Sequence, residues 1–268
     1  MEKRKFLVIV DPSHERHLAL ERMLDIMQQR RQEWVIEINL LIGFESDDKG
    51  DPDTPDEVVR SNDWFKELLH PLDESGVDYS AELFWTRSWR KSILSAAERY
   101  ACDTIMLCES SAENKTGITD SKWELVRRAN CDVVIVDEGT KAPIECILAA
   151  VNTQSSDPVH IALNERILKR GQFLADYFEA EFHVVNAYKD SEDFPDRELI
   201  RRMTGLPREN IHRDMGKPED VIAGIAEQVK ADMVVLGISA RKGLSARLGS
   251  HTNEGVMEKI NVDVVALT

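Results

Sequence analysis

The sequence has few cysteines, no long apolar run and no familiar catalytic signature. Its four cysteines stand singly in apolar surroundings, without a CxxC pair or the His spacing of a zinc site. This pattern predicts small buried side chains in a reducing compartment. No stretch approaches the roughly 20 apolar residues of a membrane span, and the apolar run Phe6–Val10 is shorter than the roughly 7–15 residues of a secretory signal. We therefore expect a cytoplasmic protein without a membrane span.

Catalytic motifs are also missing from the chain. It has no nucleophile elbow, Walker loop, HExxH motif or paired-acid constellation. His14 and His17 lie close together, but no third metal ligand is near them in the sequence, so we expect no metal site. The sequence predicts a protein that is not an enzyme.

Positive charge is scarce, because 49 acids face 34 bases and the formal net charge is −15. Nucleic-acid binders concentrate positive charge, so this balance argues against binding a phosphate backbone over a broad face. Any anion site must be local. The acidic surface neither requires nor forbids a homodimer.

An internal repeat is the most informative feature that the chain does have. The segment AERYACDTIML from Ala97 returns as AEQVKADMVVL from Ala226, an offset of 226 − 97 = 129 residues. The segment CDVVIV at 131–136 returns as VDVVAL at 262–267. Such self-similarity indicates one fold present twice. We expect domains at 1–138 and 144–268, packed as a pseudo-dimer because the linker is short.

In each copy, β-branched runs alternate with amphipathic helical stretches, which is typical of βαβ units and a parallel sheet. The fold class we expect is α/β, with a five-stranded parallel sheet flanked by helices in each copy. In the first copy we expect strands near 6–11, 34–42, 79–86, 103–108 and 132–137, and helices near 14–31, 55–75, 89–101 and 120–130. In the second copy we expect strands near 145–151, 181–187, 210–214, 232–237 and 262–267, and helices near 159–178, 196–204, 217–230 and 251–260.

Ligands of open α/β sheets sit beyond the carboxyl ends of the strands, here after the first and fourth strands of each copy. After the fourth strand of the second copy, residues 237–253 include three glycines with Arg241, Lys242 and Arg247, and no acid. A strand, a small-residue loop and a helix N-terminus near His251 favour an anion site, because unpaired N–H groups and the positive end of the helix dipole converge there. The alternative is a solvated loop whose arginines pair with acids elsewhere.

The corresponding segment of the first copy, residues 108–117, has one glycine and carries Glu109 and Glu113. A phosphate placed there would meet both carboxylates, so we expect a phosphate site in the second copy only. All five tryptophans lie in the first copy. Core and interface packing explains them most simply, and partner binding or an apolar ligand is the alternative.

Several short motifs stand at corresponding places in the two copies. The first strands end in Val10-Asp11-Pro12 and in Ala150-Val151-Asn152, and a G-x-P-x-x-x-I motif begins at Gly216. The remaining residues that match a known pattern are Gly237, Ala240, Ser250 and His251, with Thr252 in the helix that follows. Together these motifs resemble the tandem universal stress proteins over essentially the whole chain, in particular the bacterial E-type members.

The resemblance implies a Rossmann-like fold of the HUP, adenine nucleotide alpha hydrolase type and a non-catalytic role in the stress response, sensing a ligand or binding partners. It also implies that ATP or another adenine nucleotide binds in the second copy. Asn152 would accept a hydrogen bond from the base, although the family usually has Asp there, and Arg241 would hold phosphate with the amides after Ala240. The candidate ligand-binding residues are Ala150, Val151, Asn152, Gly216, Gly237, Ala240, Arg241, Ser250, His251 and Thr252.

Two other functions stay open at this point. The site could take a non-nucleotide, nucleotide-sugar or lipid-like ligand, or the chain could be a slow ATP hydrolase. The protein partners are unknown. His160 could line the cleft with Asn152 or only cap its helix, and Asp11 could face a base or serve as a turn acid beside Pro12.

Overall fold

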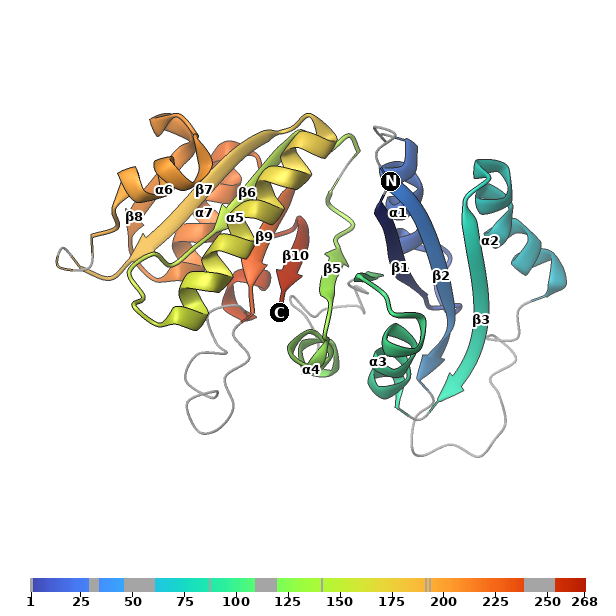
Figure 1. The fold of residues 1–268 in the computed structure, drawn as a ribbon. Coiled ribbons are helices and arrows are strands. Elements are labelled where there is room, and N and C mark those ends of the chain that lie inside the picture. The colour runs from blue at the N-terminus through green and yellow to red at the C-terminus, as the bar shows by residue number, and fades with distance from the viewer. Residues whose placement is uncertain are drawn as a thin grey trace. The chain divides into compact units, whose positions relative to one another are not determined.

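The computed structural model describes residues 2–28, 34–45, 61–86, 88–108, 120–140, 142–190, 192, 194–238 and 254–268. Contacts divide the chain into two compact units, Met1–Cys108 and Glu109–Thr268. Figure 1 shows that each unit is a sheet with helices packed on it. Among the described residues, no helix combines the length and the apolarity needed to cross a membrane.

The first unit is a four-stranded parallel sheet with helices between its strands. β1 pairs with both β2 and β4, and β2 pairs with β3, which gives the order β3-β2-β1-β4. The elements are β1 (Glu2–Val10), α1 (Leu18–Gln28), β2 (Trp34–Glu45), α2 (Asn62–Ser75), β3 (Asp78–Thr86), α3 (Trp89–Tyr100) and β4 (Thr104–Cys108).

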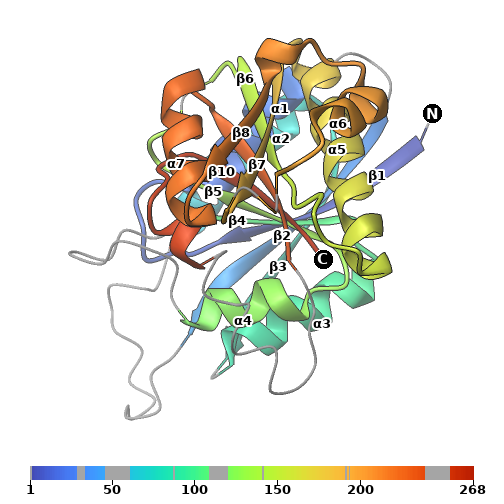
Figure 2. The ribbon, with the colours of Figure 1, turned by 90° about the vertical axis from the view of Figure 1, so that its left-hand side faces the viewer.

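The second unit contains the five-stranded parallel sheet expected for the second copy, in the order β10-β9-β6-β7-β8. Figure 2 shows α5 and α7 on opposite sides of this sheet. The elements are α4 (Asp120–Arg128), β5 (Asp132–Val136), β6 (Cys146–Ala150), α5 (Pro158–Phe178), β7 (Glu181–Tyr188), α6 (Arg197–Thr204), η3 (Arg208–Asn210), β8 (Ile211–Met215), α7 (Pro218–Val229), β9 (Met233–Gly237) and β10 (Asp263–Leu267).

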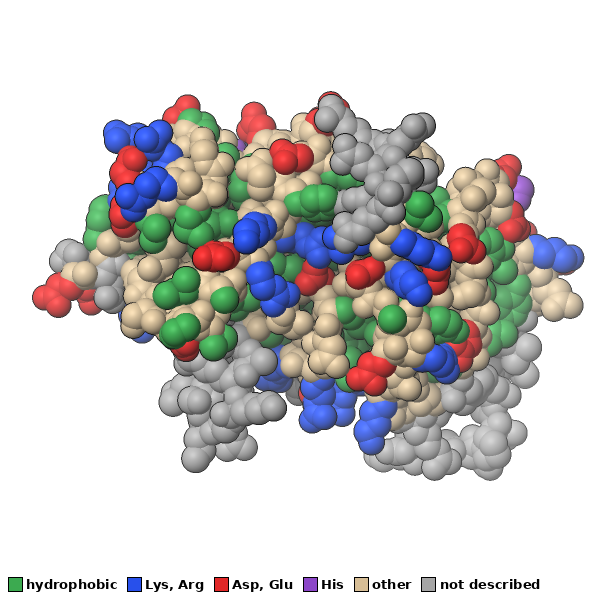
Figure 3. Space-filling model, viewed as in Figure 1, with side chains coloured by type: hydrophobic (Ala, Val, Ile, Leu, Met, Phe, Trp, Pro, Cys, Tyr) green, Lys and Arg blue, Asp and Glu red, His purple; other side chains and the backbone are tan. Residues whose placement is uncertain are grey.

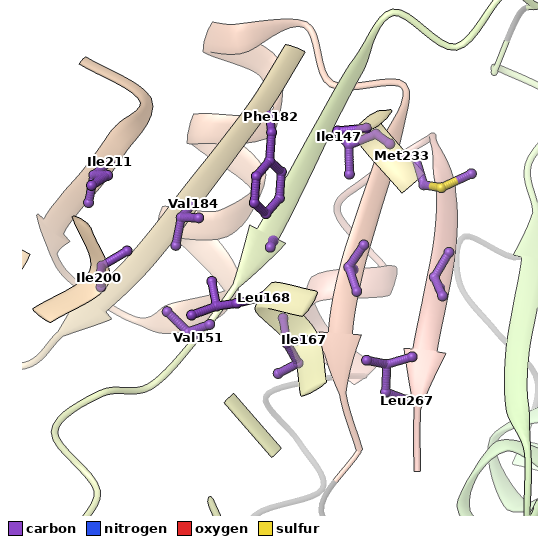
Figure 4. Packing of buried hydrophobic residues seen from close by; sticks show 14 of the residues in the cluster. Ile147, Val151, Ile167, Leu168, Phe182, Val184, Ile200, Ile211, Met233 and Leu267 are labelled. Atoms are coloured by element: carbon purple, nitrogen blue, oxygen red, sulfur yellow. The ribbon is translucent and has the colours of Figure 1, made fainter. Parts of the chain in front are cut away.

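The core of the second unit lies between this sheet and α5. Phe182 and Val184 of β7 are buried, as are Ile167 and Leu168 of α5 (Figure 4). Each such side chain contributes about 1.5–3 kcal/mol when it is fully buried. The β-branched strands and the apolar stripe of α5 therefore specify this face of the sheet.

One further strand, β5, pairs antiparallel with β10 in the second unit. Val134 lies opposite Val265, with Ile135 opposite Val264 and Val133 opposite Ala266. The segment that starts at residue 131 returns at residue 262, an offset of 131 positions. Val134 and Val265 are separated by the same 131 positions. Val134 and Val265 are thus equivalent residues that face each other, and the pairs on either side exchange partners, so a local two-fold axis relates the two strands. The predicted domain limits and the predicted pseudo-dimer packing stay predictions.

The repeated motif with Asp103 and Asp232 ties the first strand of each copy to the fourth. The Asp103 carboxylate accepts a hydrogen bond from the backbone N–H of Lys5 at 2.8 Å. The Asp232 carboxylate accepts from the N–H groups of Glu145 and Cys146, at 2.8 and 2.9 Å. The repeat at this motif is therefore structural, because the same carboxylate fixes the same strand pair in both copies.

The helix before each of these aspartates ends on a residue with positive φ. Ala101 has φ 51° and Lys230 has φ 53°, and their N–H groups donate to Ala97 and Ala226 respectively. Both residues sit 129 positions apart (230 − 101), as the repeat requires. The left-handed conformation is costly for residues with a Cβ and is the usual place for glycine.

Replacing Lys230 by glycine is expected to raise the free energy of unfolding by about 0.5–1 kcal/mol, because the strain of the left-handed conformation disappears. Urea denaturation followed by circular dichroism measures the change. Lys230→Ala is the control, since it removes the charge and keeps the strained φ. An equal gain in both variants would show that backbone strain is not the cause.

Three helix boundaries differ from the sequence prediction. The helix expected from 55 begins at Asn62, because Ser61 is its extended N-cap and accepts a hydrogen bond from the Trp64 N–H. The helix expected from 14 begins at Leu18, because the Asp11 carboxylate accepts hydrogen bonds from the N–H and Oγ of Ser13 and forms a turn there. The helix expected at 251–260 is helical at 254–257, and residues 251–253 lie outside the described residues.

Candidate functional site

The strand order of the second unit reverses at β6. From β6 the chain passes to β7 and β8 on one side, and then returns to β9 on the other side. The carboxyl ends of β6 and β9 are therefore neighbours, with Asn152 shortly after the first and Gly237 at the end of the second. Such a switch point is where open α/β sheets hold their ligands.

Asn152 is held in place by a buried asparagine of α5. The backbone N–H of Asn152 donates to Oδ1 of Asn164 at 3.0 Å, and Nδ2 of Asn164 donates to the Asn152 carbonyl at 2.7 Å. The side chain of Asn152 is exposed and makes no hydrogen bond to any described residue. Its backbone is thus fixed and its amide group is open to a ligand.

Asn186 of β7 anchors the segment that follows Asn152. It is completely buried. Its Oδ1 accepts from the N–H and the Oγ1 of Thr153, at 3.0 and 2.7 Å. Its Nδ2 donates to Oε1 of Gln154 at 2.8 Å and to the Ala187 carbonyl at 3.0 Å. The sequence analysis missed Asn186 and Asn164, although an asparagine within the apolar strand EFHVVNAY was a visible signal.

Gly237 allows α5 to approach the end of β9. A Cβ at this position would come within 2.7 Å of the Leu163 side chain and 2.8 Å of Ile167. The next residue, Ile238, donates its N–H to the Leu267 carbonyl at 2.7 Å. Gly237 therefore shapes the sheet edge from which the predicted phosphate loop departs.

Of the other candidate residues, three are described by the structure and five are not. Ala150 and Val151 are buried, and the Val151 N–H donates to the Val185 carbonyl at 3.0 Å, so they position Asn152 from the sheet. Gly216 follows β8 and donates its N–H to the Tyr188 carbonyl at 2.9 Å. The candidates that lie outside the described residues, and stay predictions, are Ala240, Arg241, Ser250, His251 and Thr252.

The two ambiguous residues of the sequence analysis both take part in turns. Asp11 forms the turn with Ser13 described above. His160 lies on the first turn of α5, and its Nδ1 is 2.9 Å from the Oγ of Ser155. Among the described residues, no three His, Cys, Asp or Glu side chains are grouped to hold a metal ion.

None of the four cysteines forms a disulfide bond. Cys102 and Cys146 are buried as predicted, whereas Cys108 and Cys131 are only partly buried. Burial raises the pKa of the Cys146 thiol to about 12, with Asp232 and Glu181 acting in the same direction. The thiolate is the reactive form of cysteine, so this thiol is inert at neutral pH.

Comparison with known proteins gives a consistent result. Residues 177–267 match the model of the universal stress protein family. The chain is 22% identical to the universal stress protein E homolog of Haemophilus influenzae, over 100% of this chain and 98% of that protein. It is 26% identical to universal stress protein E of Escherichia coli K12, over 98% and 93%. A candidate universal stress protein from Pseudomonas aeruginosa UCBPP-PA14 has the same fold, with a TM-score of 0.81 at 24% identity over 98% of this chain and 92% of that one.

Proposed function

Because this chain belongs to the universal stress protein family and is a tandem member of the E type, we propose that it is a cytoplasmic, non-catalytic ligand-binding protein of the stress response. The ligand we propose is ATP or another adenine nucleotide, bound at the carboxyl ends of β6 and β9. One nucleotide binds per chain, in the second copy.

The observation that carries this proposal is the arrangement at Asn152. Its backbone is clamped by Asn164 at the switch point, and its side-chain amide is exposed. An amide group can accept a hydrogen bond from the amino group of adenine and donate one to a ring nitrogen at the same time. Asparagine therefore suits an adenine base at least as well as an aspartate, which can only accept.

The phosphates would lie toward residues 239–253, which follow Gly237 directly. Arg241 and the backbone amides after Ala240 would hold them, near Ser250, His251 and Thr252. Support for this comes from the position of Gly237, at the end of the strand that pairs with β6. The absence of any acid from 237 to 253 suits an anion in a chain with net charge −15.

A slow ATP hydrolase would need an acid beside the phosphates to hold a metal ion, and this segment contains none. Turnover that Arg241→Ala abolishes, and that persists through extensive purification, would favour this alternative. A nucleotide-sugar or lipid-like ligand would not be expected to make both of the hydrogen bonds that an adenine base makes with the Asn152 amide. A slow hydrolase would bind the same nucleotide with the same residues, so turnover alone separates it from the proposal.

Replacing Asn152 by leucine is expected to weaken ATP binding by about tenfold or more, because two hydrogen bonds to the base are lost. Isothermal titration calorimetry of the full chain with ATP measures the change. Asn62→Leu is the matched control, since Asn62 is an exposed asparagine of the first unit. Equal ATP affinity of Asn152→Leu and the wild-type protein would contradict the proposed base contact.

A further inference from the structure

A second pocket lies at the outer edge strand of the second unit, away from the switch point. It has a volume of about 390 Å³. Its basic lining comes from three different elements, with Arg197 on α6, Arg208 on η3, and His212 and Arg213 on β8. Figure 3 shows Lys and Arg side chains gathered over α6 in this part of the molecule. The lining also includes the acids Glu209 and Asp214.

Two of these arginines carry buried donors without a partner. The Nε atoms of Arg197 and Arg213 are buried and make no hydrogen bond. A buried donor left unpaired costs about 1–3 kcal/mol. Both side chains line the same pocket, so the protein leaves part of each guanidinium group there without an acceptor.

Other contacts fix the guanidinium group of Arg213. Its Nη1 donates to the Pro195 carbonyl at 2.9 Å, and its central carbon lies 4.4 Å from the centre of the Phe194 ring. A guanidinium group held in this way loses little conformational freedom when it binds an anion. This preorganisation is typical of binding arginines.

The positive groups of the pocket act on one another. Burial lowers the pKa of Arg213, and the neighbouring Arg197 lowers it further. Burial also lowers the pKa of His212, His183 and Arg197 act in the same direction, and Asp214 opposes them. Mutual repulsion between fixed cations is relieved when an anion binds between them.

The acids at this pocket do not neutralise the two arginines. Glu209 and Asp214 are exposed, whereas Arg197, His212 and Arg213 are partly buried. Arg208 donates to the Glu198 carboxylate at 3.1 Å. Asp196 and Tyr188 oppose the effect of Arg197 on Arg213, but among the described residues neither Arg197 nor Arg213 forms an ion pair with a carboxylate within 4 Å.

We propose that this pocket binds the phosphate group of a small phosphorylated molecule, with Arg197 and Arg213 as the ligands of the phosphate. Guanidinium groups match the geometry of phosphate oxygens. Ile211 and Ile225 also line the pocket, but both are buried, so its accessible lining is mainly polar, as suits a phosphate group. The volume lies within the range of small-molecule sites, roughly 300–1,000 Å³. This site shares no residue with the proposed nucleotide site.

Titration of the full chain with inorganic phosphate tests this proposal, with the His212 imidazole resonances observed by nuclear magnetic resonance. Wild-type protein is expected to show a saturable shift of these resonances.

Arg213→Gln and Arg197→Gln are each expected to weaken phosphate binding about tenfold or more, because each removes charge-assisted hydrogen bonds. Arg202→Gln is the matched control on α6, since Arg202 is exposed and lies near Asp196 at 3.8 Å. Its phosphate affinity is expected to stay within about twofold of wild type.

Three results would overturn the proposal. These are the absence of a saturable His212 shift in wild-type protein, an equal loss of affinity in Arg202→Gln, and unchanged affinity in both pocket variants. If Arg213→Gln lowers the unfolding temperature, Arg197→Gln decides the outcome. Arg241→Ala removes the arginine proposed to hold the nucleotide phosphates and is expected to leave the His212 shift unchanged, which separates this site from the proposed nucleotide site.

Discussion

Replacing Asn186 by leucine is expected to lower the free energy of unfolding by about 3 kcal/mol, although the two side chains have similar volumes. The buried amide of Asn186 makes four hydrogen bonds, to Thr153, Gln154 and Ala187. Leucine can make none of them, so the Thr153 N–H and the Ala187 carbonyl each lose a partner. Urea denaturation followed by circular dichroism measures the loss.

The matched control for this variant is Gln154→Leu. Gln154 is only partly buried and shares one hydrogen bond with Asn186, so its replacement is expected to cost about 1 kcal/mol. A loss below 1 kcal/mol in Asn186→Leu would show that the segment after β6 is held by other contacts. Asn186→Leu is also expected to weaken ATP binding, because Asn186 holds Thr153 and Thr153 directly follows Asn152.

Replacing Gly171 by alanine is expected to lower the free energy of unfolding by about 2 kcal/mol, although alanine is the better helix former. Gly171 lies in α5 against β7. A Cβ there would come within 2.5 Å of the Phe182 ring and 3.3 Å of the Ala149 Cβ. The ring is buried in the core, so it cannot move aside without leaving its own packing.

Gly224 of α7 offers the matched control, because it is also within a helix and nothing lies within 4 Å of the Cβ that alanine would add. Gly224→Ala is expected to stabilise the protein by about 0.5–1 kcal/mol through helix propensity alone. The two variants should therefore differ in sign. Stabilisation by Gly171→Ala of the same size would contradict the close approach of α5 to Phe182.

The parts of the fold that the sequence predicted are those that leave a periodic or repeated pattern. The β-branched runs marked the strands, and the repeated segments marked the two copies. That Asp103 and Asp232 each tie a first strand to a fourth is visible only in the structure. Hydrophobic periodicity reports which face of an element is buried. The alternation of strands and helices predicted a ligand site after the first and fourth strands of the second copy. These strands are β6 and β9, which pair with each other in the second unit.

The parts that the sequence did not reveal depend on polar contacts between distant positions. Asn164 and Asn186 reach the segment after β6 from α5 and β7, and nothing in their local sequence names that partner. Arg197 and Arg213 come from α6 and β8, two of the elements that line the pocket, and both arginines look solvated in the sequence. Such sites are set by strand register and helix placement, which only the three-dimensional structure supplies.

The stoichiometry of nucleotide binding tests the central claim most directly, since the account places one adenine nucleotide at Asn152 in the second copy only. Native mass spectrometry of freshly purified protein, and of the same protein titrated with ATP, measures it on the intact chain. We expect a single ATP-sized mass increase in wild-type protein, and its loss in Asn152→Leu at the same ATP concentration. Two nucleotides per chain, no nucleotide at all, or a single adduct that survives in Asn152→Leu would contradict the account.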